Sequence, residues 1–345
     1  MVTIKDVARR AGVSVATVSR VLNKSGPVSP AAAERIHEAA EALHYVPHGG
    51  ARSLITSKTN TIGVLLPDLY GGFFSEMIRG IDQTAQQHGY HLLLSGSHNR
   101  RHEMEVAMRA MRGRTDGIIA MSPHFDARTL VENLPPSLPV ILLSCEARDT
   151  DYQVIAIDNV GGAATMVRHL IALGHRRIAM VMGEKGHFDT AERLQGYRQA
   201  LVEAGIEPDP RYEAQGDFSE ASGHHAVQEL LALEEQPTAI FCANDSMAIG
   251  GLAAVHEAGL QVPDDITVVG FDDIPLAHYL SPPLSSVHVP VFEMGERAVT
   301  RLIAALKGEP VSERHHERLP TRLVVRASCA PPPVDDRAPS VARAS

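Results

Sequence analysis

Side chains able to bind a ligand follow the ends of several short apolar segments in this chain. Open sheets of parallel strands bind ligands beyond the carboxyl ends of the strands, so residues just past such segments are candidates for one site. They comprise aromatic rings, an arginine, and amide, imidazole and carboxylate groups. The candidates are Asp68, Phe73, Phe74, residues 183–189 with His187 and Asp189, Arg193, residues 216–219 with Phe218, residues 244–246 with Asn244, and Asp272 with Asp273.

These groups match what a polyhydroxylated ring requires. Aromatic rings stack on its C–H faces, and guanidinium and carboxylate groups make paired hydrogen bonds with neighbouring hydroxyls. Simpler roles stand beside this one: Phe74 packs in the core, Asp245 caps a helix, and Arg193 and Asp272 are surface charges. The histidines have no metal-ligand spacing, and we predict neither a metal nor a cofactor.

An enzyme acting on a sugar or a nucleotide in the same cleft is the remote alternative. The sequence contains no P-loop and no GxGxxG, GxSxG or HExxH pattern, which disfavours catalysis. The candidate carboxylates are explained more simply as hydrogen-bond partners of a ligand. We therefore predict a binding protein rather than an enzyme.

A second pattern occupies Thr3 to Asn23. Ile4, Val7 and Ala8 have the spacing of one helix face, and Gly12 suits the tight turn that follows. Ser14 can cap a second helix, in which Val15, Val18, Val21 and Leu22 are the apolar positions and Ala16, Thr17, Ser19 and Arg20 lie on another face. An ordinary helical hairpin is the alternative, but the pattern favours a helix-turn-helix, whose second helix enters the DNA major groove.

The remaining pattern predicts the elements that position these residues. Pro30 begins a third helix that runs to about His44, and from Thr61 short apolar strands alternate with helices, which is typical of doubly wound parallel sheets. A second series begins at Val154. The expected strands are 61–66, 91–95, 117–121, 140–144, 178–182, 239–242 and 267–271, and the expected helices are 73–88, 101–112, 161–173, 190–204, 219–233, 245–258 and 292–306.

The charge is divided unevenly along the chain. The 345 residues carry a net charge of −9, but residues 1–60 contain eight basic and four acidic residues, which leaves −13 for the rest. A basic end can meet DNA phosphates while an acidic body is repelled. Three scattered cysteines, no signal peptide and no long apolar run predict a reduced, cytoplasmic protein without a membrane span.

The segment VSVATVSRVLN, Val13 to Asn23, resembles the signature of the LacI/GalR family of bacterial transcriptional repressors, and the resemblance extends to about Ala330. It implies an all-α helix-turn-helix head followed by two α/β lobes like those of periplasmic sugar-binding proteins. Val15 and Ala16 match the positions that vary most with operator sequence, and both can touch thymine methyls. Arg20 can bond a guanine, while Thr3, Lys5, Thr17, Ser19 and Asn23 fit phosphate or helix-end contacts.

The resemblance also assigns roles between and within the lobes. It implies a hinge helix near residues 47–59, whose Leu54 wedges into the minor groove and kinks the operator. Gly49 and Gly50 depart from the bulkier residues usual there and raise the cost of ordering the hinge. Phe73, Arg193, Phe218, Asn244 and Asp272 fall at effector-contacting positions, and His187 and Asp189 fall in a variable contact loop.

We expect a homodimeric, effector-responsive repressor bound to a pseudo-palindromic operator. The expected divisions are a head over 1–46, a hinge over 47–59, a core over 60–330 and a disordered tail over 331–345. Within the core, one lobe takes about 60–158 and 290–318, and the other takes about 159–289 and 319–330. A small sugar is the expected effector. A nucleobase, a phosphorylated metabolite or a phosphoprotein is the alternative, although His187 and Asp189 replace the residues that contact purine in purine-binding members.

Overall fold

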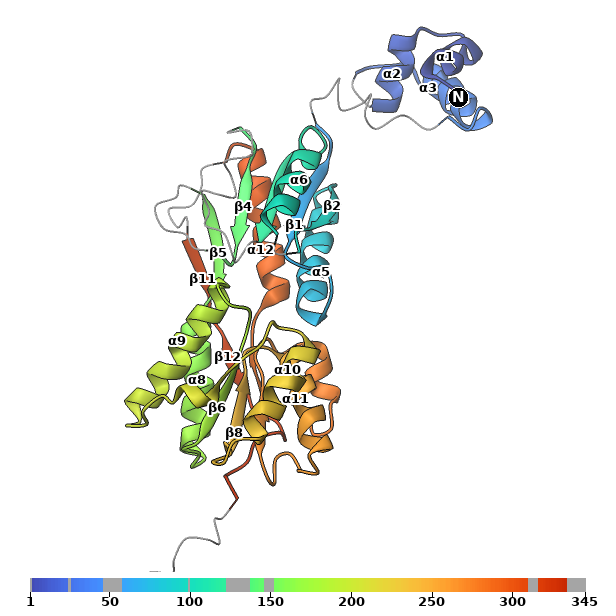
Figure 1. Cartoon of the computed structure of the whole chain (residues 1–345). Helices are drawn as coiled ribbons and strands as arrows, with labels where there is room; N and C mark the ends of the chain where they lie inside the picture. Colours follow the sequence, from blue (N-terminus) through green and yellow to red (C-terminus); the bar gives the residue numbers. More distant parts are fainter. Residues whose placement is uncertain are drawn as a thin grey trace, which may run out of the picture. The chain divides into compact units, whose positions relative to one another are not determined.

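The computed structural model describes residues 2–23, 26–45, 58–98, 100–121, 137–145, 152–309 and 316–333. The chain divides into two compact units, Met1–Thr61 with Gly113–Asp116 and Ile62–Arg112 with Gly117–Ser345. Helices and strands of both units are labelled in Figure 1. Within the described ranges, no helix is long and apolar enough to cross a membrane.

Three helices form the N-terminal part of the first unit: α1 (Ile4–Ala11), α2 (Val15–Asn23) and α3 (Pro30–Ala42). The Thr3 hydroxyl and backbone N–H both donate to the Asp6 carboxylate, which closes the start of α1. Gly12 ends α1 with φ of 65°, and the Ser14 hydroxyl accepts from the backbone N–H of Thr17 to begin α2. The expected turn and cap are therefore confirmed.

Small apolar side chains fill the centre of this three-helix head. Val7, Val18 and Ile36 come from the three different helices and are fully buried. Burial of such side chains contributes about 1.5–3 kcal/mol each, which offsets the weak intrinsic stability of short helices. Val15 departs from the expected apolar face, because 39% of it is exposed.

The first sheet of the second unit has the strand order β11-β5-β4-β3-β1-β2. Its strands are β1 (Thr61–Leu66), β2 (His91–Gly96), β3 (Gly117–Met121), β4 (Val140–Leu143), β5 (Gln153–Ile157) and β11 (His316–Leu319). The pairs β1–β3, β3–β4, β4–β5 and β5–β11 are parallel. Parallel pairing requires crossovers, and both faces of such a sheet are covered.

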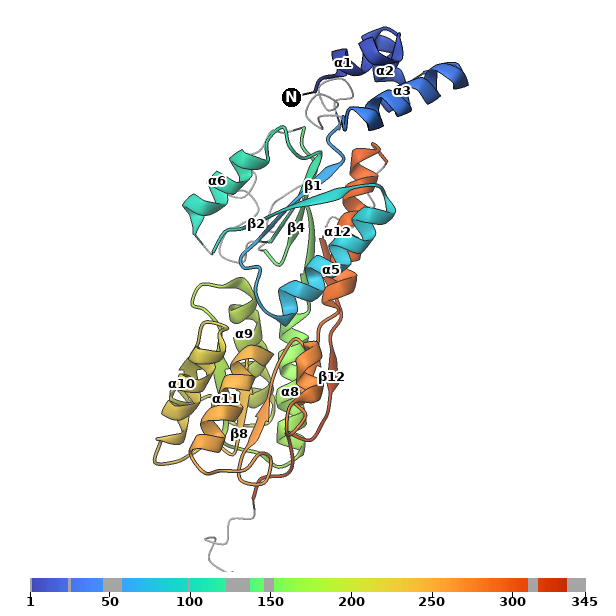
Figure 2. The ribbon, with the colours of Figure 1, turned by 90° about the vertical axis from the view of Figure 1, so that its right-hand side faces the viewer.

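Alternate residues along these strands enter different packing layers. Val64 packs in the layer of α5 (Gly72–Gln87) and α12 (Val291–Leu306), whereas Leu65 packs with α6 (Arg101–Met111). The two helices α5 and α12 approach closely, because a Cβ added at Gly80 would lie 2.2 Å from the Phe292 carbonyl oxygen. Figure 2 shows α6 on the side of the sheet away from α5 and α12.

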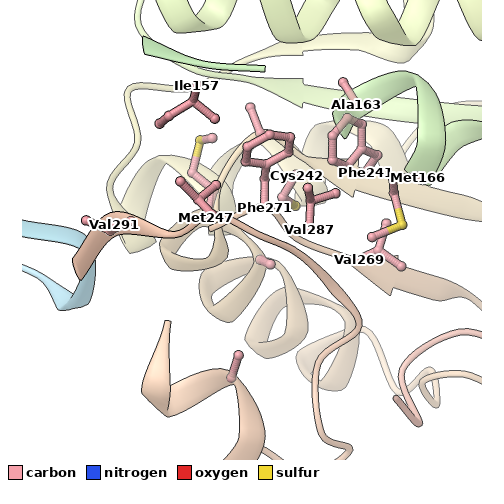
Figure 3. Close-up of a cluster of buried hydrophobic side chains, with 14 of the residues drawn as sticks. Ile157, Ala163, Met166, Phe241, Cys242, Met247, Val269, Phe271, Val287 and Val291 are labelled. Atoms are coloured by element: carbon pink, nitrogen blue, oxygen red, sulfur yellow. The ribbon is translucent and has the colours of Figure 1, made fainter. Parts of the chain in front are cut away.

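The second sheet has the order β7-β6-β8-β9, and all three pairings are parallel. Its strands are β6 (Ile178–Met182), β7 (Glu213–Gln215), β8 (Ala239–Cys242) and β9 (Thr267–Val269). In Figure 1, helices α8 (Asn159–Ala172) and α9 (Phe188–Glu203) lie on one side of it, and α10 (Glu220–Leu231) and α11 (Asp245–Glu257) lie on the other. Figure 3 shows Phe241 and Phe271 among the apolar side chains of this core.

Three described segments connect the lobe built on the first sheet with the lobe built on the second sheet. They run from β5 into α8, from β10 (Ser286–His288) into α12, and from β11 into β12 (Arg322–Val324). Strands β10 and β12 form an antiparallel pair. Backbone hydrogen bonds therefore join the connection that follows β10 to the connection that precedes β12. Short 3-10 helices, Pro210–Tyr212 and Pro275–Tyr279, complete the second unit.

The expected alternation of strands and helices, and hence the two parallel-sheet lobes, is confirmed. The expectation that the second series begins at Val154 is wrong, because β5 pairs with β4 and extends the first sheet. The three-residue strand β7 escaped prediction, since Glu-Ala-Gln has no apolar pattern. The domain limits at the hinge and the tail fall mostly outside the described ranges and stay predictions.

Candidate DNA-reading helix and effector cleft

Helix α2 presents a small exposed surface suited to reading base edges. Ala16 and Arg20 are exposed and lie four residues apart, so they are neighbours on one helix face. Val15 lies one position before Ala16 and is also exposed. The apolar side chain of Ala16 can contact a thymine methyl group, and the neighbouring guanidinium of Arg20 can bond to a guanine edge.

The other predicted DNA contacts differ in how freely they can reach DNA. Lys5 is exposed on α1, whereas the hydroxyl of Thr17 lies 2.8 Å from that of Ser14. The Asn23 amide donates to the Ser19 hydroxyl at 3.2 Å. Thr3 is engaged with Asp6 as described above. These hydroxyls shape the ends of α1 and α2, and phosphate contacts by them stay predictions. Leu54 lies outside the described residues.

A cavity of about 220 Å³ opens at the carboxyl ends of strands from both sheets. All eight residues predicted to contact an effector line it: Phe73, Phe74, His187, Asp189, Arg193, Phe218, Asn244 and Asp272. The first two begin α5 after β1, and the others follow β6, β7, β8 and β9. The topology therefore brings these eight residues together, although Lys185, Asp245 and Asp273, which also follow strand ends, do not line the cavity.

Arg193 is the central cation of this cleft. It is only 3% exposed, and its guanidinium lies 3.9 Å from the ring centre of Phe271. Its Nε donates to the Asn159 side-chain oxygen at 2.9 Å, and Nη1 donates to the Ala243 carbonyl at the end of β8. The guanidinium has five N–H donors, and these two hydrogen bonds leave others to face a ligand.

Asp272 and Asp189 supply the buried carboxylates. Asp272 Oδ1 lies 3.3 Å from Arg193 Nη2 and has no hydrogen-bond partner of good geometry among the described residues. Burial raises the pKa of Asp272 to about 7 and that of Asp189 to about 6, although the nearby Arg193 partly opposes both shifts. Such costly buried acceptors are typical of a binding site whose ligand donates hydrogen bonds.

Phe218 forms an aromatic wall with His187. The two ring centres lie 4.7 Å apart, and Phe218 has a positive φ of 72°. Asp272 also has a positive φ, 107°, so two cleft residues have backbone conformations that are rare outside glycine. On the first sheet's side, the rings of Phe73 and Phe74 meet edge to face at 5.3 Å, and Phe74 both packs against the core and lines the cavity.

Gly183 provides the space that Phe218 occupies. A Cβ at Gly183 would lie 2.0 Å from Phe218 Cζ, well inside contact distance. We therefore expect Gly183→Ala to displace the aromatic wall and to weaken effector binding by roughly tenfold or more, because a stacked ring contributes about 1 kcal/mol beyond its buried area and its displacement also disturbs the cleft. Isothermal titration calorimetry measures this. Gly26→Ala is the control, because an added Cβ there would lie 3.6 Å from the Arg20 side chain, an ordinary contact distance, and Gly26 lies outside the cleft; equal losses in both variants would contradict the role of Gly183.

Asn244, rather than Asp245, caps α11. The Asn244 side chain accepts from the Met247 N–H and donates to the Phe218 carbonyl, so it also holds the aromatic wall. The predicted capping role of Asp245 is wrong: its carboxylate is buried and accepts from Ile274 N and Ser286 Oγ. Burial and the nearby Asp272 raise the pKa of Asp245.

The structure adds residues to the cleft that the sequence pattern missed. Tyr70, Met121, Glu220 and Ile274 also line it. Met121 ends β3, so its position at a strand end was an available signal. Tyr70 and Ile274 lie in loops with no periodic pattern. Among the described residues, no group of three or more His, Cys, Asp or Glu could hold a metal ion.

The fold and the cleft define a class: a ligand-binding α/β core preceded by a helix-turn-helix head. Comparison with known families supports this division of the chain. Residues 167–329 match the periplasmic binding protein-like domain, and residues 3–48 match the bacterial regulatory proteins of the lacI family. The ribose operon repressor of Escherichia coli (strain K12) is 36% identical over 331 residues, covering 95% of this chain and all of the repressor.

Solved structures show the same relationship. The lac repressor dimer bound to operator and an anti-inducer matches with a TM-score of 0.85 and 31% identity, covering 95% of this chain and 99% of the other. A LacI family regulator from Enterococcus faecium with bound ribose matches with a TM-score of 0.71 and 29% identity, covering 79% and 99%. This chain belongs to the lacI family. It is a DNA-binding transcriptional repressor with an effector-binding core, and not an enzyme.

Proposed function

We propose that the cleft binds a small, uncharged sugar and that its occupancy changes the affinity of a homodimer for operator DNA. The observation that carries this proposal is the combination of Arg193, two buried carboxylates and aromatic walls around one cavity of about 220 Å³. That volume is below the range of about 300–1,000 Å³ typical of drug-sized sites, which favours a single ring.

The charge of the cleft disfavours phosphorylated ligands. Asp68, Asp189, Asp217, Glu220 and Asp272 line the cavity, and Arg193 is the only arginine or lysine among its described lining residues. Asp272 already lies beside that guanidinium. An anionic phosphate would meet an excess of negative charge and would have to be desolvated against it. Hydroxyl groups, in contrast, can donate to the carboxylates and accept from the arginine.

A nucleobase is the second candidate for the same cleft, since a flat ring could stack on Phe218. The buried carboxylates favour a ligand with several neighbouring donors, which a sugar offers around its whole ring. The matched regulator from Enterococcus faecium binds ribose in its structure, and the curated relative is named for ribose. These similarities support a sugar for this chain.

On the DNA side, we propose that each head reads one half of a pseudo-palindromic operator. The lac repressor structure is a dimer on its operator, and a two-fold dimer requires a site with matching symmetry. Arg20 and Ala16 are the proposed base-reading residues, and Leu54 is the proposed minor-groove wedge at the centre of the site. Closure of the lobes on a sugar would then alter the hinge geometry.

Calorimetric titration of the full chain tests the sugar assignment. The probes are ribose, cellobiose, hypoxanthine and ribose 5-phosphate, each added separately to the protein without DNA. We expect binding of a free sugar and none of ribose 5-phosphate. Binding of hypoxanthine alone would assign a nucleobase, and binding of ribose 5-phosphate in preference to ribose would contradict the charge argument.

The two cleft carboxylates make sugar binding depend on pH. Asp272 and Asp189 have pKa values of about 7 and about 6 when folded, so both are mainly ionised near about pH 8 and mainly protonated near about pH 5. We expect sugar affinity to fall as pH decreases, since the protonated carboxyls accept hydrogen bonds less well. Calorimetry across this range measures the effect.

The free energy of unfolding of the sugar-free protein should rise as pH decreases, whereas sugar affinity falls. The folded pKa values lie above the unfolded value of 3.8, so the unfolded state releases these protons first as pH rises. The stability that protonation provides is therefore lost between about pH 4 and about pH 7, and the sugar-free protein should melt at a higher temperature near about pH 5 than near about pH 8. Asp272→Asn should flatten this trend in thermal melts, and exposed Asp264→Asn should leave it unchanged.

A further inference from the structure

Asn159 is the residue through which Arg193 and Asp189 are oriented. It is fully buried at the start of α8. Its amide nitrogen donates to Asp189 Oδ1 at 2.9 Å and to Glu192 Oε2 at 3.2 Å, while its side-chain oxygen accepts from Arg193 Nε at 2.9 Å. Only this orientation of the amide satisfies all three neighbours, because the nitrogen donates and the oxygen accepts.

Glu192 contributes a second set of contacts outside the cavity. Its carboxylate accepts from Arg318, with Nη2 at 2.7 Å and Nη1 at 3.2 Å. Arg318 Nη1 also lies 3.4 Å from the Ile157 carbonyl oxygen. The pair is bidentate and its Glu192 side is largely buried, whereas Arg318 is half exposed, so the pair lies at the edge of the protein interior.

The topology places this pair where the two sheets are joined. Glu192 lies on α9, which packs in the second sheet's core, whereas Arg318 lies on β11 of the first sheet. Asn159 directly follows the connection from β5 to α8, and Arg318 precedes the connection from β11 to β12. A change in the relative position of the sheets must therefore alter the Glu192–Arg318 pair or carry α9 with it.

We propose that Glu192 is a positioning residue of the effector site, which holds Asn159 toward Arg193 and Asp189 and, through Arg318, couples cleft occupancy to the arrangement of the two sheets. This inference rests on the proposed function, namely that the cleft binds the effector. Glu192 does not line the cavity, so it acts through Asn159 rather than by touching the ligand.

Two substitutions at Glu192 separate these roles. Glu192→Gln keeps an oxygen that can accept from Asn159 but loses the charge that pairs with Arg318. Glu192→Leu loses both. Arg318→Met removes the ion pair together with the Arg318 hydrogen bond to the Ile157 carbonyl, and it leaves the Glu192–Asn159 contact in place. Glu203→Gln is the matched control, because Glu203 is on the same helix and pairs with Arg168 of α8 at 2.9 Å, within the second sheet's layer.

The experiment measures two quantities for full-length protein: the Kd for ribose by calorimetry, and the ratio of operator affinities with and without saturating ribose by fluorescence anisotropy. Glu192→Leu should raise the Kd about tenfold, since a buried amide loses a partner. Glu192→Gln and Arg318→Met should leave the Kd near the wild-type value but move the ratio toward one. A merely structural role would instead lower the melting temperature with both quantities unchanged.

The outcomes are distinguishable from failure of the sugar assignment. If wild-type protein binds ribose and Glu192→Leu has the same Kd, or if neither Glu192→Gln nor Arg318→Met changes the ratio, the assignment of Glu192 is overturned. If wild-type protein binds another free sugar in place of ribose, that sugar is used in both measurements. If it binds no free sugar, the sugar proposal fails, and amide hydrogen exchange of the sugar-free protein tests the role of Glu192 instead. Glu192→Leu should then speed amide exchange around Asn159 and Arg318 relative to Glu203→Gln, and unchanged exchange there would overturn the inference.

Discussion

Arg193→Leu is expected to abolish the response of the operator complex to sugar. The guanidinium contacts Asn159, the Ala243 carbonyl and the side of Asp272, so its removal takes away the cleft's cation and leaves buried acceptors unpaired. Truncation of one partner of a buried, hydrogen-bonded charge pair in a complex costs about 2–5 kcal/mol of binding free energy, which corresponds to roughly 30-fold or more in affinity. Calorimetry should detect no sugar binding at concentrations that saturate the wild-type protein.

The control for this variant is Arg198→Leu on the same helix. Arg198 is half exposed and pairs with Glu213 rather than with cleft residues. Arg193→Lys provides a second check, because it keeps the positive charge but loses the planar fork, and it should bind sugar weakly while folding more stably than Arg193→Leu. Wild-type sugar affinity in Arg193→Leu, with the variant folded, would contradict the assignment of the cleft.

Arg20→Ala is expected to reduce specific operator affinity strongly. A bidentate arginine–guanine contact provides about 1–3 kcal/mol of discrimination. A symmetric dimer makes the contact twice, so the loss should reach about 2–6 kcal/mol, or roughly 30-fold or more in Kd. Competition binding to the selected operator and to variants at the guanine position measures both affinity and specificity.

Arg35→Ala is the matched control for Arg20, since Arg35 is an exposed arginine on α3 of the same head. It should weaken binding to operator and to unrelated DNA alike, because it changes only the general charge. In Arg20→Ala, specific binding should fall much more than nonspecific binding. If the two variants lose the same affinity for both kinds of DNA, Arg20 does not read a base.

The cleft could be predicted to a large extent from sequence because its residues follow a local rule. All the candidates except Phe218, which follows the polar strand β7, come after a short apolar strand, and parallel strands bring their carboxyl ends to one edge. Phe73, Arg193 and Asp272 therefore meet although they are far apart in the chain. The same reasoning predicted the helix-turn-helix, whose Gly12 turn and Ser14 cap are contacts between near neighbours.

What sequence could not predict depends on contacts between distant segments. The strand β7 has the sequence Glu-Ala-Gln, which shows no apolar pattern, and it is defined by its pairing with β6. The role of Asn159 depends on Arg193 and Glu192 approaching from another helix. The requirement for Gly183 appears only once the Phe218 ring is placed against it.

The most direct test of the account is operator binding by the full-length protein, followed by fluorescence anisotropy during a titration with sugar. The operator is first selected from random duplexes by binding to the protein. We expect a pseudo-palindromic site and at least a roughly tenfold change in operator Kd on saturation with a free sugar, which is within the usual range of allosteric coupling. Arg193→Leu should show no such change. An operator affinity that no free sugar alters in the wild-type protein would contradict the account.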